Sequence, residues 1–373
     1  MITTPAFKDR KFAVLGLARS GLSAVRALVA GGAEVLAWDN DEGARIKVAD
    51  IATIADPLLT DLTGYTAIVV SPGVPINRHP IADKAKAAGI PLIGDIELFA
   101  MARPNLPQHR VVGITGTNGK STTTALVHHL LESAAIPVRM GGNIGLPILS
   151  QEPLPAGGIY VLELSSYQID ITHSLACDAA ALINLSPDHL DRYDGYEGYM
   201  ASKARLFEMQ KGKEFAVFGK GDADTERVYN DVLARRGAEW VHLADPQLVS
   251  GQAEWPSLQG PHNLQNIAVA IAIVDDGGHL LWFERMDGAA PSTSYMAPAK
   301  ANTAALGRRE SRIYEEMING GRYAFLSAPK QQGLLEGGVP IIKDGQVIGA
   351  VGVSGVKSQD DAQIARAAIA ALG

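Results

Sequence analysis

The chain has 373 residues, enough for two or three domains, and its content of 47% hydrophobic and 20% charged residues excludes a disordered chain or a coiled coil. The formal net charge of −7 disfavours bulk binding to nucleic acid or to an anionic membrane. The one cysteine, Cys177, excludes an internal disulfide and a zinc site built from cysteines. Because we find neither a secretory signal nor an apolar run of membrane-spanning length, we expect a cytoplasmic protein.

The first hundred residues alternate between strand-like and helix-like segments. Apolar runs at 11–17, 33–39 and 67–71 predict strands, and residues 22–30 have a helical pattern. Strands that alternate with helices form parallel sheets. The polar, proline-rich stretch 103–109 has the composition of a linker. We therefore predict a Rossmann-like domain over residues 1–107.

A second α/β domain, similar to a P-loop ATPase domain, is predicted over residues 108–270. Strands are expected at 110–115, 159–164, 180–185 and 215–218, with a helix at 120–135. After about residue 270 the pattern changes to two strand–turn–strand segments, 271–283 and 339–353, which contain Asp-Gly at their turns. With a last helix at 359–372, this pattern predicts a small α+β domain over 271–373.

The clearest functional pattern is a glycine-rich turn between a strand and a helix at 113–122. Backbone amides in such a turn bind phosphate oxygens, a lysine reaches the outer phosphates, and a hydroxyl can ligate Mg²⁺. Ile114 stands where the general pattern has a glycine, so the turn alone leaves a plain strand–helix connection open. The candidate nucleotide-binding residues are Gly116, Thr117, Asn118, Gly119, Lys120, Ser121 and Thr122.

Further polar residues of this domain are candidates for the same site. Glu163 ends an apolar strand, where its carboxylate needs a partner, either a metal ion or backbone donors. Asn143 lies in a second glycine turn, at 141–145. By spacing alone, His189 is typical of an ordinary turn histidine and Lys203 of a solvated lysine.

A glycine turn also follows the first predicted strand. Gly16 and Gly21 match two glycines of a dinucleotide-binding turn, but Ala18 replaces the middle one. Asp39 ends the next strand, where an acidic residue binds ribose in such folds. These residues leave two alternatives open, a weak NAD site and a plain turn.

Six motifs together resemble the Mur ligase family over about residues 8–270. They are TGTNGKST, GGNIG, LELSSYQ, NLSPDHLDRY, SKARLF and GPHNLQN, in the family's order. The family's phosphate loop also lacks the early glycine. The resemblance is greatest to the branch that adds D-glutamate to UDP-N-acetylmuramoyl-L-alanine, so it implies an ATP-dependent amide ligase of peptidoglycan synthesis. ATP would phosphorylate the substrate carboxylate, and D-glutamate would attack the acyl phosphate to form a C–N bond.

The same resemblance implies roles for individual residues. Lys120 would hold the β- and γ-phosphates, Asn263 would lie near adenine, and Asn143 would contact the transferring phosphate or the substrate. Mg²⁺ would be bound by Ser121, Glu163, His189 and a Lys203 that is carbamylated by CO₂, and the catalytic set would be Lys120, Glu163, His189 and Lys203. The first domain would bind the UDP part of the substrate, through Arg19, Ser20, Asp39, Asn40, Ser71 and Gly73.

From about residue 271 the sequence instead resembles the GlcG/HbpS-like family. The matching stretches are IAIVDDGGHLLWFERMDGA, AKANTAAL and GGVPIIKDGQVIGAVGVSG. The module stands in place of the ligase domain that binds the amino acid and closes over ATP, so we expect impaired turnover. Residues 262–272 fit the start of a ligase helix, and the overlapping residues 267–274 fit the first strand of the module, which indicates a fusion.

This second resemblance implies an alternative function. Some GlcG/HbpS-like proteins bind haem and many form oligomers. The alternative is therefore a nucleotide-binding protein without catalysis, whose module binds haem or another small cofactor, with His279 as a candidate ligand, or drives homo-oligomer formation.

Overall fold

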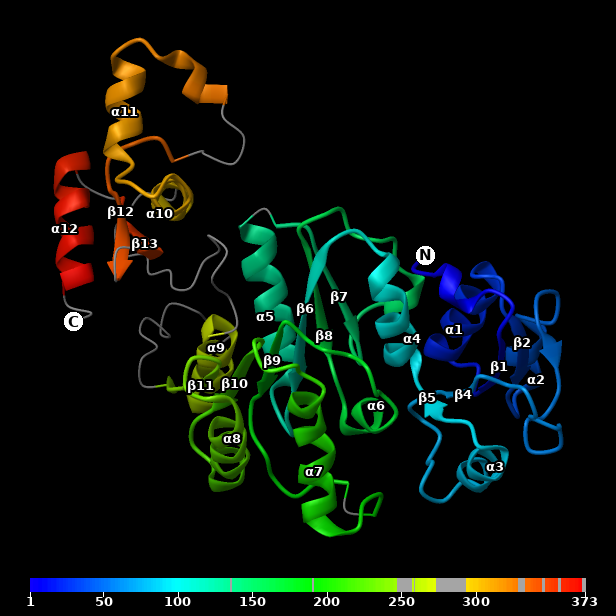
Figure 1. The fold of residues 1–373 in the computed structure, drawn as a ribbon. Coiled ribbons are helices and arrows are strands. Elements are labelled where there is room, and N and C mark those ends of the chain that lie inside the picture. Colours follow the sequence, from blue (N-terminus) through cyan, green and yellow to red (C-terminus); the bar gives the residue numbers. More distant parts are fainter. Residues whose placement is uncertain are drawn as a thin grey trace. The chain divides into compact units, whose positions relative to one another are not determined.

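A computed structural model describes residues 1–134, 136–189, 191–246, 257, 259–272, 293–327, 333–343, 346–354 and 357–370. The chain divides into two compact units, Met1–Ile273 and Val274–Gly373 (Figure 1). None of the helices within the described ranges is both long enough and apolar enough to cross a membrane.

The first unit begins with a five-stranded parallel sheet in the order β3-β2-β1-β4-β5. The central strands consist almost entirely of buried apolar residues, because helices cover the faces of a parallel sheet. This order confirms the predicted Rossmann-like architecture. The elements are β1 (Lys11–Leu15), α1 (Arg19–Ala30), β2 (Glu34–Trp38), α2 (Glu42–Ile46), β3 (Thr53–Ile54), β4 (Ala67–Val70), α3 (Ile81–Ala88), β5 (Leu92–Ile93) and α4 (Asp95–Ala102).

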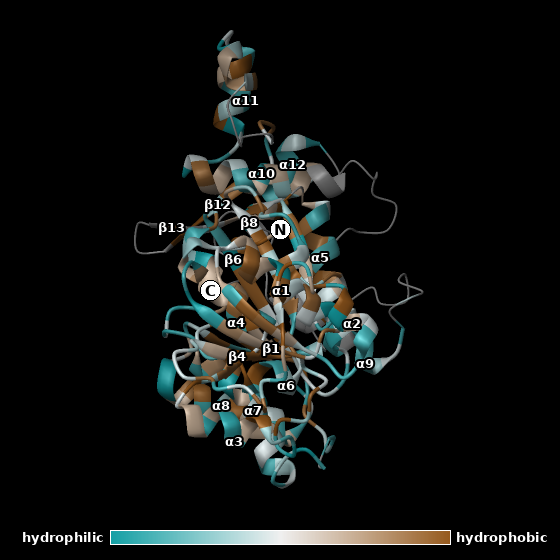
Figure 2. Ribbon diagram, turned by 90° about the vertical axis from the view of Figure 1, so that its right-hand side faces the viewer, coloured by the Kyte–Doolittle hydropathy of each residue, from teal (hydrophilic) through white to brown (hydrophobic). Residues whose placement is uncertain are grey.

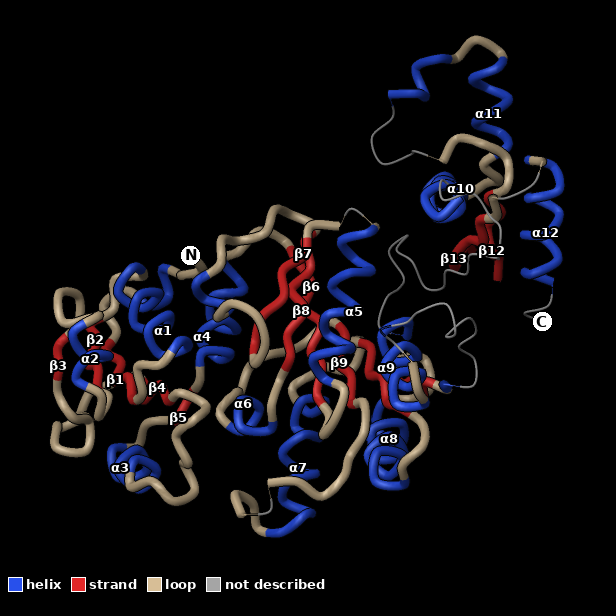
Figure 3. Tube along the Cα trace, turned by 180° about the vertical axis from the view of Figure 1, so that it is seen from behind, coloured by secondary structure: helices blue, strands red, loops and turns tan. Residues whose placement is uncertain are grey.

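A six-stranded parallel sheet follows, in the order β11-β10-β9-β6-β8-β7. Helices α5 and α9 pack against each other, while α7 contacts α6, α8 and β9 (Figure 3). The central strand β6 leads into the glycine-rich turn, so this turn lies at the carboxyl edge of the sheet, where α/β proteins bind ligands. The elements are β6 (His109–Thr115), α5 (Lys120–Ser133), β7 (Val138–Gly142), β8 (Gly158–Glu163), α6 (Ser166–Asp170), β9 (Ala179–Leu182), α7 (Gly195–Glu208), β10 (Phe215–Gly219), α8 (Ala223–Arg236), β11 (Val241–Ala244) and α9 (Pro261–Ala272).

One continuous hydrophobic core joins the two sheets of the first unit. Figure 2 shows hydrophobic residues concentrated in the strands. Phe99 of α4 contacts Tyr160 of β8, with ring centroids 5.1 Å apart. The stretch 103–109, which the sequence predicts to be a linker, is anchored because Arg103 donates to the Asp178 carboxylate at 3.0 Å. The two sheets are therefore firmly connected.

The second unit contains a β-hairpin with helices packed on it. Strands β12 (Gly338–Lys343) and β13 (Gln346–Gly352) pair antiparallel, as predicted for 339–353. Helices α10 (Thr293–Gly307) and α12 (Ser358–Ala370) both contact this hairpin, and α11 (Arg312–Asn319) follows α10. The strand–turn–strand segment predicted at 271–283 lies outside the described residues, except for its first two.

The stretch that fits two sequence patterns is a helix. Residues 267–272 belong to α9, which packs on α5, β10 and β11. The prediction that a strand begins at Ile267 or Ile271 is therefore wrong for these residues. The physical reason is that this alanine-rich segment has high helix propensity and buries Ile267 against the first unit.

Candidate active site

The glycine-rich turn between β6 and α5 has the backbone of an anion-binding loop. Gly116 and Gly119 have φ angles of +154° and +81°, a region where larger residues are strained. Lys120 is the first residue of α5, so the free amides of the helix N-terminus, with Ser121 and Thr122, face the loop. The Lys120 ammonium donates to the carbonyls of Gly116 (2.9 Å) and Thr117 (2.8 Å), which places a cation over the loop.

Residues after β9 hold this loop in place. The Asn184 side chain accepts from the Asn118 amide at 2.8 Å and donates to the Asn118 carbonyl at 3.2 Å. The Thr117 hydroxyl accepts from the Ser186 amide at 3.0 Å and lies 3.2 Å from the Tyr199 hydroxyl. Sequence reasoning missed Asn184 and Tyr199, because only the folded chain brings them to the loop.

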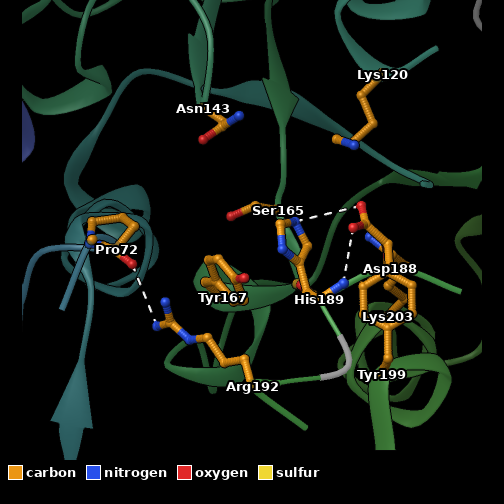
Figure 4. A pocket seen from close by; sticks show the side chains of 12 residues that line it. Pro72, Lys120, Asn143, Ser165, Tyr167, Asp188, His189, Arg192, Tyr199 and Lys203 are labelled. Atoms are coloured by element: carbon orange, nitrogen blue, oxygen red, sulfur yellow. Dashed lines mark hydrogen bonds and ion pairs between the residues drawn. The ribbon is translucent and has the colours of Figure 1, made fainter. Parts of the chain in front are cut away.

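A cavity of about 440 Å³ opens beside the loop (Figure 4). It lies where the carboxyl edge of the second sheet meets the loop after β4 of the first sheet. Five residues predicted from the sequence line it, together with residues that the sequence did not single out. The lining residues are Pro72, Gly73, Lys120, Asn143, Ser165, Ser166, Tyr167, Asp188, His189, Arg192, Tyr199 and Lys203.

Glu163 ends β8 and is almost fully buried, with 2% of its surface exposed. Its Oε1 accepts a hydrogen bond from Asn143 Nδ2 at 2.9 Å. Its Oε2 is buried and has no hydrogen-bond partner within the described ranges. A buried carboxylate oxygen is costly without a partner, so Glu163 offers a free oxygen that suits a divalent cation.

Lys203 lies in α7 with 1% of its surface exposed. Its ammonium donates to the Gly116 carbonyl at 2.9 Å and lies 4.7 Å from the centre of the Tyr199 ring. Burial, followed by the charge of Lys120, lowers the pKa of Lys203 to about 7. Close to neutral pH a large fraction of this amine is therefore uncharged, unlike the solvated lysine that its spacing suggests.

His189 lies at the edge of the cavity in a turn with φ of +51°. Its ring centroid is 5.0 Å from that of Tyr167, and its Nε2 is 3.5 Å from an oxygen of Asp188. The described part of the chain contains no group of three His, Cys, Asp or Glu side chains that could hold a metal alone. Because Mg²⁺ at nucleotide sites takes one or two carboxylates and completes its shell with phosphate and water, Glu163 fits such an ion.

Asp39 organises the first glycine turn of the chain. Its two carboxylate oxygens accept from the backbone amides of Leu17 (2.6 Å) and Asp41 (2.9 Å). Asn40 is exposed beside it. One oxygen of Asp39 thus holds the backbone just before α1, where a helix N-terminus can receive an anion, and the other holds the N-cap residue of α2.

The other residues predicted to bind the UDP part surround the same turn. Ser71 donates to the Gly16 carbonyl at 2.8 Å, which ties the loop after β4 to the loop after β1. Arg19 donates to the Gly145 carbonyl at 2.6 Å and so reaches the second sheet. Ser20 lies in the first turn of α1, near the buried Asp95, whose pKa burial raises to about 6.

Helix α9 brings an asparagine that the sequence did not single out to the glycine-rich turn, while the prediction that Asn263 lies near adenine stays a prediction. Asn266 is 2% exposed and so close to Gly119 that a Cβ there would lie 2.1 Å from its Oδ1. Asn263, the predicted residue, donates to the Gln259 carbonyl and accepts from Asn266 at 3.0 Å. Asn266 was missed although it lies one helical turn after Asn263, a spacing that puts both on one face.

Three family models match the chain. They are the Mur ligase MurD-like N-terminal domain at residues 10–94, the Mur ligase middle domain at 114–243, and the haem-degrading protein HbpS-like family at 262–370. Both resemblances found in the sequence are therefore confirmed. The HbpS-like match begins inside α9, which is the last helix of the first unit and packs on α5, β10 and β11.

Curated relatives extend this result. The UDP-N-acetylmuramoylalanine–D-glutamate ligase of Novosphingobium aromaticivorans is 66% identical over 273 residues, which are 73% of this chain and 62% of the relative. The ligase of the same name from Paramagnetospirillum magneticum is 38% identical over 338 residues, 85% of this chain and 70% of the relative. The chain belongs to the Mur ligase family. It spans about 62% of the length of the most similar relative named here.

Proposed function

We propose that this chain is an ATP-dependent ligase that joins D-glutamate to UDP-N-acetylmuramoyl-L-alanine with a C–N bond. The observation that best supports the proposal is the cavity beside the phosphate loop. Its lining brings together the Lys120 ammonium, the Lys203 amine and the amide of Asn143, which donates to Glu163, a carboxylate with one oxygen unpaired among the described residues. Such a site can neutralise the negative charge of a transferring phosphoryl group.

In this proposal the phosphate loop binds ATP through its backbone amides and through Lys120. The alanine carboxylate of the substrate attacks the γ-phosphorus, so that a C–O–P linkage forms and ADP leaves. The amine of D-glutamate then attacks the acyl carbon, the bond to the phosphate oxygen breaks, and the nitrogen loses a proton. Asn143, whose amide donates to Glu163, would contact the transferring group.

Mg²⁺ is part of the proposal, with Glu163, His189, Ser121 and a modified Lys203 as its residues. The ion would supply positive charge at the phosphate oxygens. The lowered pKa of Lys203 supports the predicted carbamylation, because only an uncharged amine can attack CO₂. The ammonium first loses a proton to give the amine; the amine then forms an N–C bond to CO₂ as one C=O π bond breaks, and it releases a second proton. The product is an anion that can ligate a metal.

The second unit follows α9 directly, and we propose that it stands where other family members bind the incoming amino acid. Impaired turnover with D-glutamate is then expected, because positioning of the second substrate contributes several powers of ten to such rates. Cytoplasmic location and homo-oligomer formation through this unit stay predictions. For the haem alternative, the candidate ligand His279 lies outside the described residues.

The test is ADP release by the full chain with ATP, Mg²⁺ and UDP-N-acetylmuramoyl-L-alanine, with and without D-glutamate. Hydroxylamine in the assay traps an acyl phosphate as a hydroxamate, so it reports the first step even if the second is slow. We expect hydroxamate formation that requires the nucleotide substrate and is abolished in Lys120→Ala. A well-folded chain that forms neither hydroxamate nor ADP would contradict the proposal.

A further inference from the structure

The loop after β4 forms a tight turn at the rim of the cavity. The Ser71 amide donates to the Leu15 carbonyl and the Val74 amide donates to the Ser71 carbonyl, both at 3.0 Å. Gly73 lies at the tip, where a Cβ would meet no atom within 4 Å. Its backbone amide donates no hydrogen bond to any residue that the structure describes. The turn therefore presents a free donor at the cavity rim.

Arg192, which the sequence analysis did not single out, holds both sides of this tip. Its guanidinium donates to the carbonyls of Pro72 (3.4 Å) and Val74 (2.9 Å), the two residues that flank Gly73. The same guanidinium lies 3.5 Å from the centre of the ring of Tyr167, a residue of α6 (Figure 4). A planar guanidinium suits this arrangement, because it can stack on an aromatic ring and donate at its edge.

These contacts have a directional consequence for the loop. Two carbonyls accept hydrogen bonds from the Arg192 guanidinium, so the negative ends of their dipoles are paired with a cation and repel an anion at the rim less. The Gly73 amide is left as the polar group that can face such an anion. Arg192 itself adds a positive charge at the same rim.

We propose that Arg192 is a positioning residue that presents the Gly73 amide to the diphosphate of the nucleotide-linked substrate. This inference rests on the proposed function, since it assumes that substrate. Arg192 is then expected to affect the affinity for the nucleotide sugar but not the affinity of the glycine-rich turn for ATP.

A second cation on the same two loops provides a matched control. Arg78 contacts the Asp191 carbonyl and lies 3.8 Å from its carboxylate. It therefore joins the loop after β4 to the turn before Arg192, as Arg192 does. However, it is exposed and does not contact the carbonyls beside Gly73. Removing the Arg78 side chain weakens the contact between the two loops but leaves the hydrogen bonds of Arg192 to the carbonyls beside Gly73 in place.

The test is calorimetric titration of the full chain with UDP-N-acetylmuramoyl-L-alanine, without ATP or metal, for the wild type, Arg192→Ala, Arg192→Lys and Arg78→Ala. We expect the affinity to fall about tenfold or more in Arg192→Ala, because charge-assisted hydrogen bonds are lost. Arg192→Lys should recover part of it, and Arg78→Ala should stay within about twofold of the wild type. Affinity for a non-hydrolysable ATP analogue should be unchanged in all variants, which also reports correct folding.

The outcomes separate this inference from the proposed function. If the wild type binds the nucleotide sugar and Arg192→Ala binds it equally well, the inference is wrong and the proposed function stands. If Arg78→Ala loses as much affinity as Arg192→Ala, general contact between the loops is responsible and the inference is also wrong. If the wild type binds no nucleotide sugar, the proposed function fails and this inference fails with it. In turnover, the expected signature is a raised KM for the nucleotide sugar with kcat little changed.

Discussion

Among the described residues each unit of the chain buries one lysine, and the two lysines lie in different surroundings. In the second unit, Lys300 of α10 forms an ion pair at 2.9 Å with Asp361 of α12 and donates to the Val353 carbonyl. In the first unit, Lys203 is equally buried, but it has no carboxylate within ion-pair distance among the described residues and contacts the phosphate loop instead.

This difference distinguishes a structural site from a functional one. A buried ion pair with satisfied hydrogen bonds joins two helices at little net cost or gain. A buried ammonium without a counter-ion destabilises the folded state. Its pKa is therefore lowered, so that the neutral amine is populated near neutral pH. Functional sites are where such a loss of stability is found, because catalysis or binding there needs an amine with a shifted pKa. A lysine thus joins two helices in the second unit, whereas in the first unit a lysine with a lowered pKa lies beside the glycine-rich turn.

The largest expected effect is on turnover in Lys203→Met. Loss of the modifiable amine should lower acyl-phosphate formation by about 10³-fold, because a charged group is removed from the transition state. The melting temperature should not fall, since an unpaired buried charge is lost as well. Hydroxamate formation and a thermal scan measure the two quantities, with the exposed Lys211→Met as the control. If Lys203→Met formed acyl phosphate at the wild-type rate, Lys203 would have no functional role and would not differ from Lys300 in this respect.

The opposite behaviour is expected for Lys300→Ala. The variant leaves Asp361 buried without its main cation, so the second unit should lose about 3–5 kcal/mol of unfolding free energy. Hydrogen exchange in α10 and α12 under increasing urea measures this loss, and ATP-analogue affinity should stay within about twofold. The double variant Lys300→Met with Asp361→Leu should restore most of the stability. Unchanged exchange in Lys300→Ala would show that the pair is dispensable.

The pH dependence of stability gives a smaller effect. The pKa of Lys203 is about 7 in the folded chain and near its ordinary 10.5 when unfolded. Between these pH values the unfolded state binds more protons than the folded state, so the free energy of unfolding rises with pH. The destabilisation caused by burying the Lys203 ammonium is therefore complete below pH 7 and absent above pH 10.5. From pH 7 to pH 9, CO₂-free wild type should gain roughly 2 kcal/mol relative to Lys203→Met. Parallel pH profiles for the two proteins would contradict the lowered pKa.

The smallest effect compares two asparagines of α9. Asn266→Ala should weaken binding of an ATP analogue about tenfold, because its buried amide supports the phosphate loop at Gly119. Asn263→Ala should change the affinity by about twofold or less. Calorimetry of both variants measures the difference. If Asn263→Ala lost more affinity for the ATP analogue than Asn266→Ala, Asn263 would be the more important of the two residues, as the sequence predicted.

Much of the fold could be predicted because it depends on local patterns. The apolar runs that become β1, β6 and β12 and the glycine turn before Lys120 are contiguous in the sequence, and the structure places the strands within a few residues of the prediction. Residues 267–272 could not be assigned in this way. Their apolar pattern fits a strand or a helix, and contact with α5 decides between them.

The sequence by itself determined the family, the order of the α/β domains and the phosphate loop, because each depends on residues close together along the chain. Only the tertiary structure showed that Lys203 is buried with no carboxylate of a described residue in ion-pair distance, that one oxygen of Glu163 is unpaired within the described ranges, and that Arg192 reaches the loop at Gly73. Burial and charge balance depend on segments distant in sequence that meet when the sheets pack together. These long-range contacts, which no local sequence pattern specifies, form the candidate site.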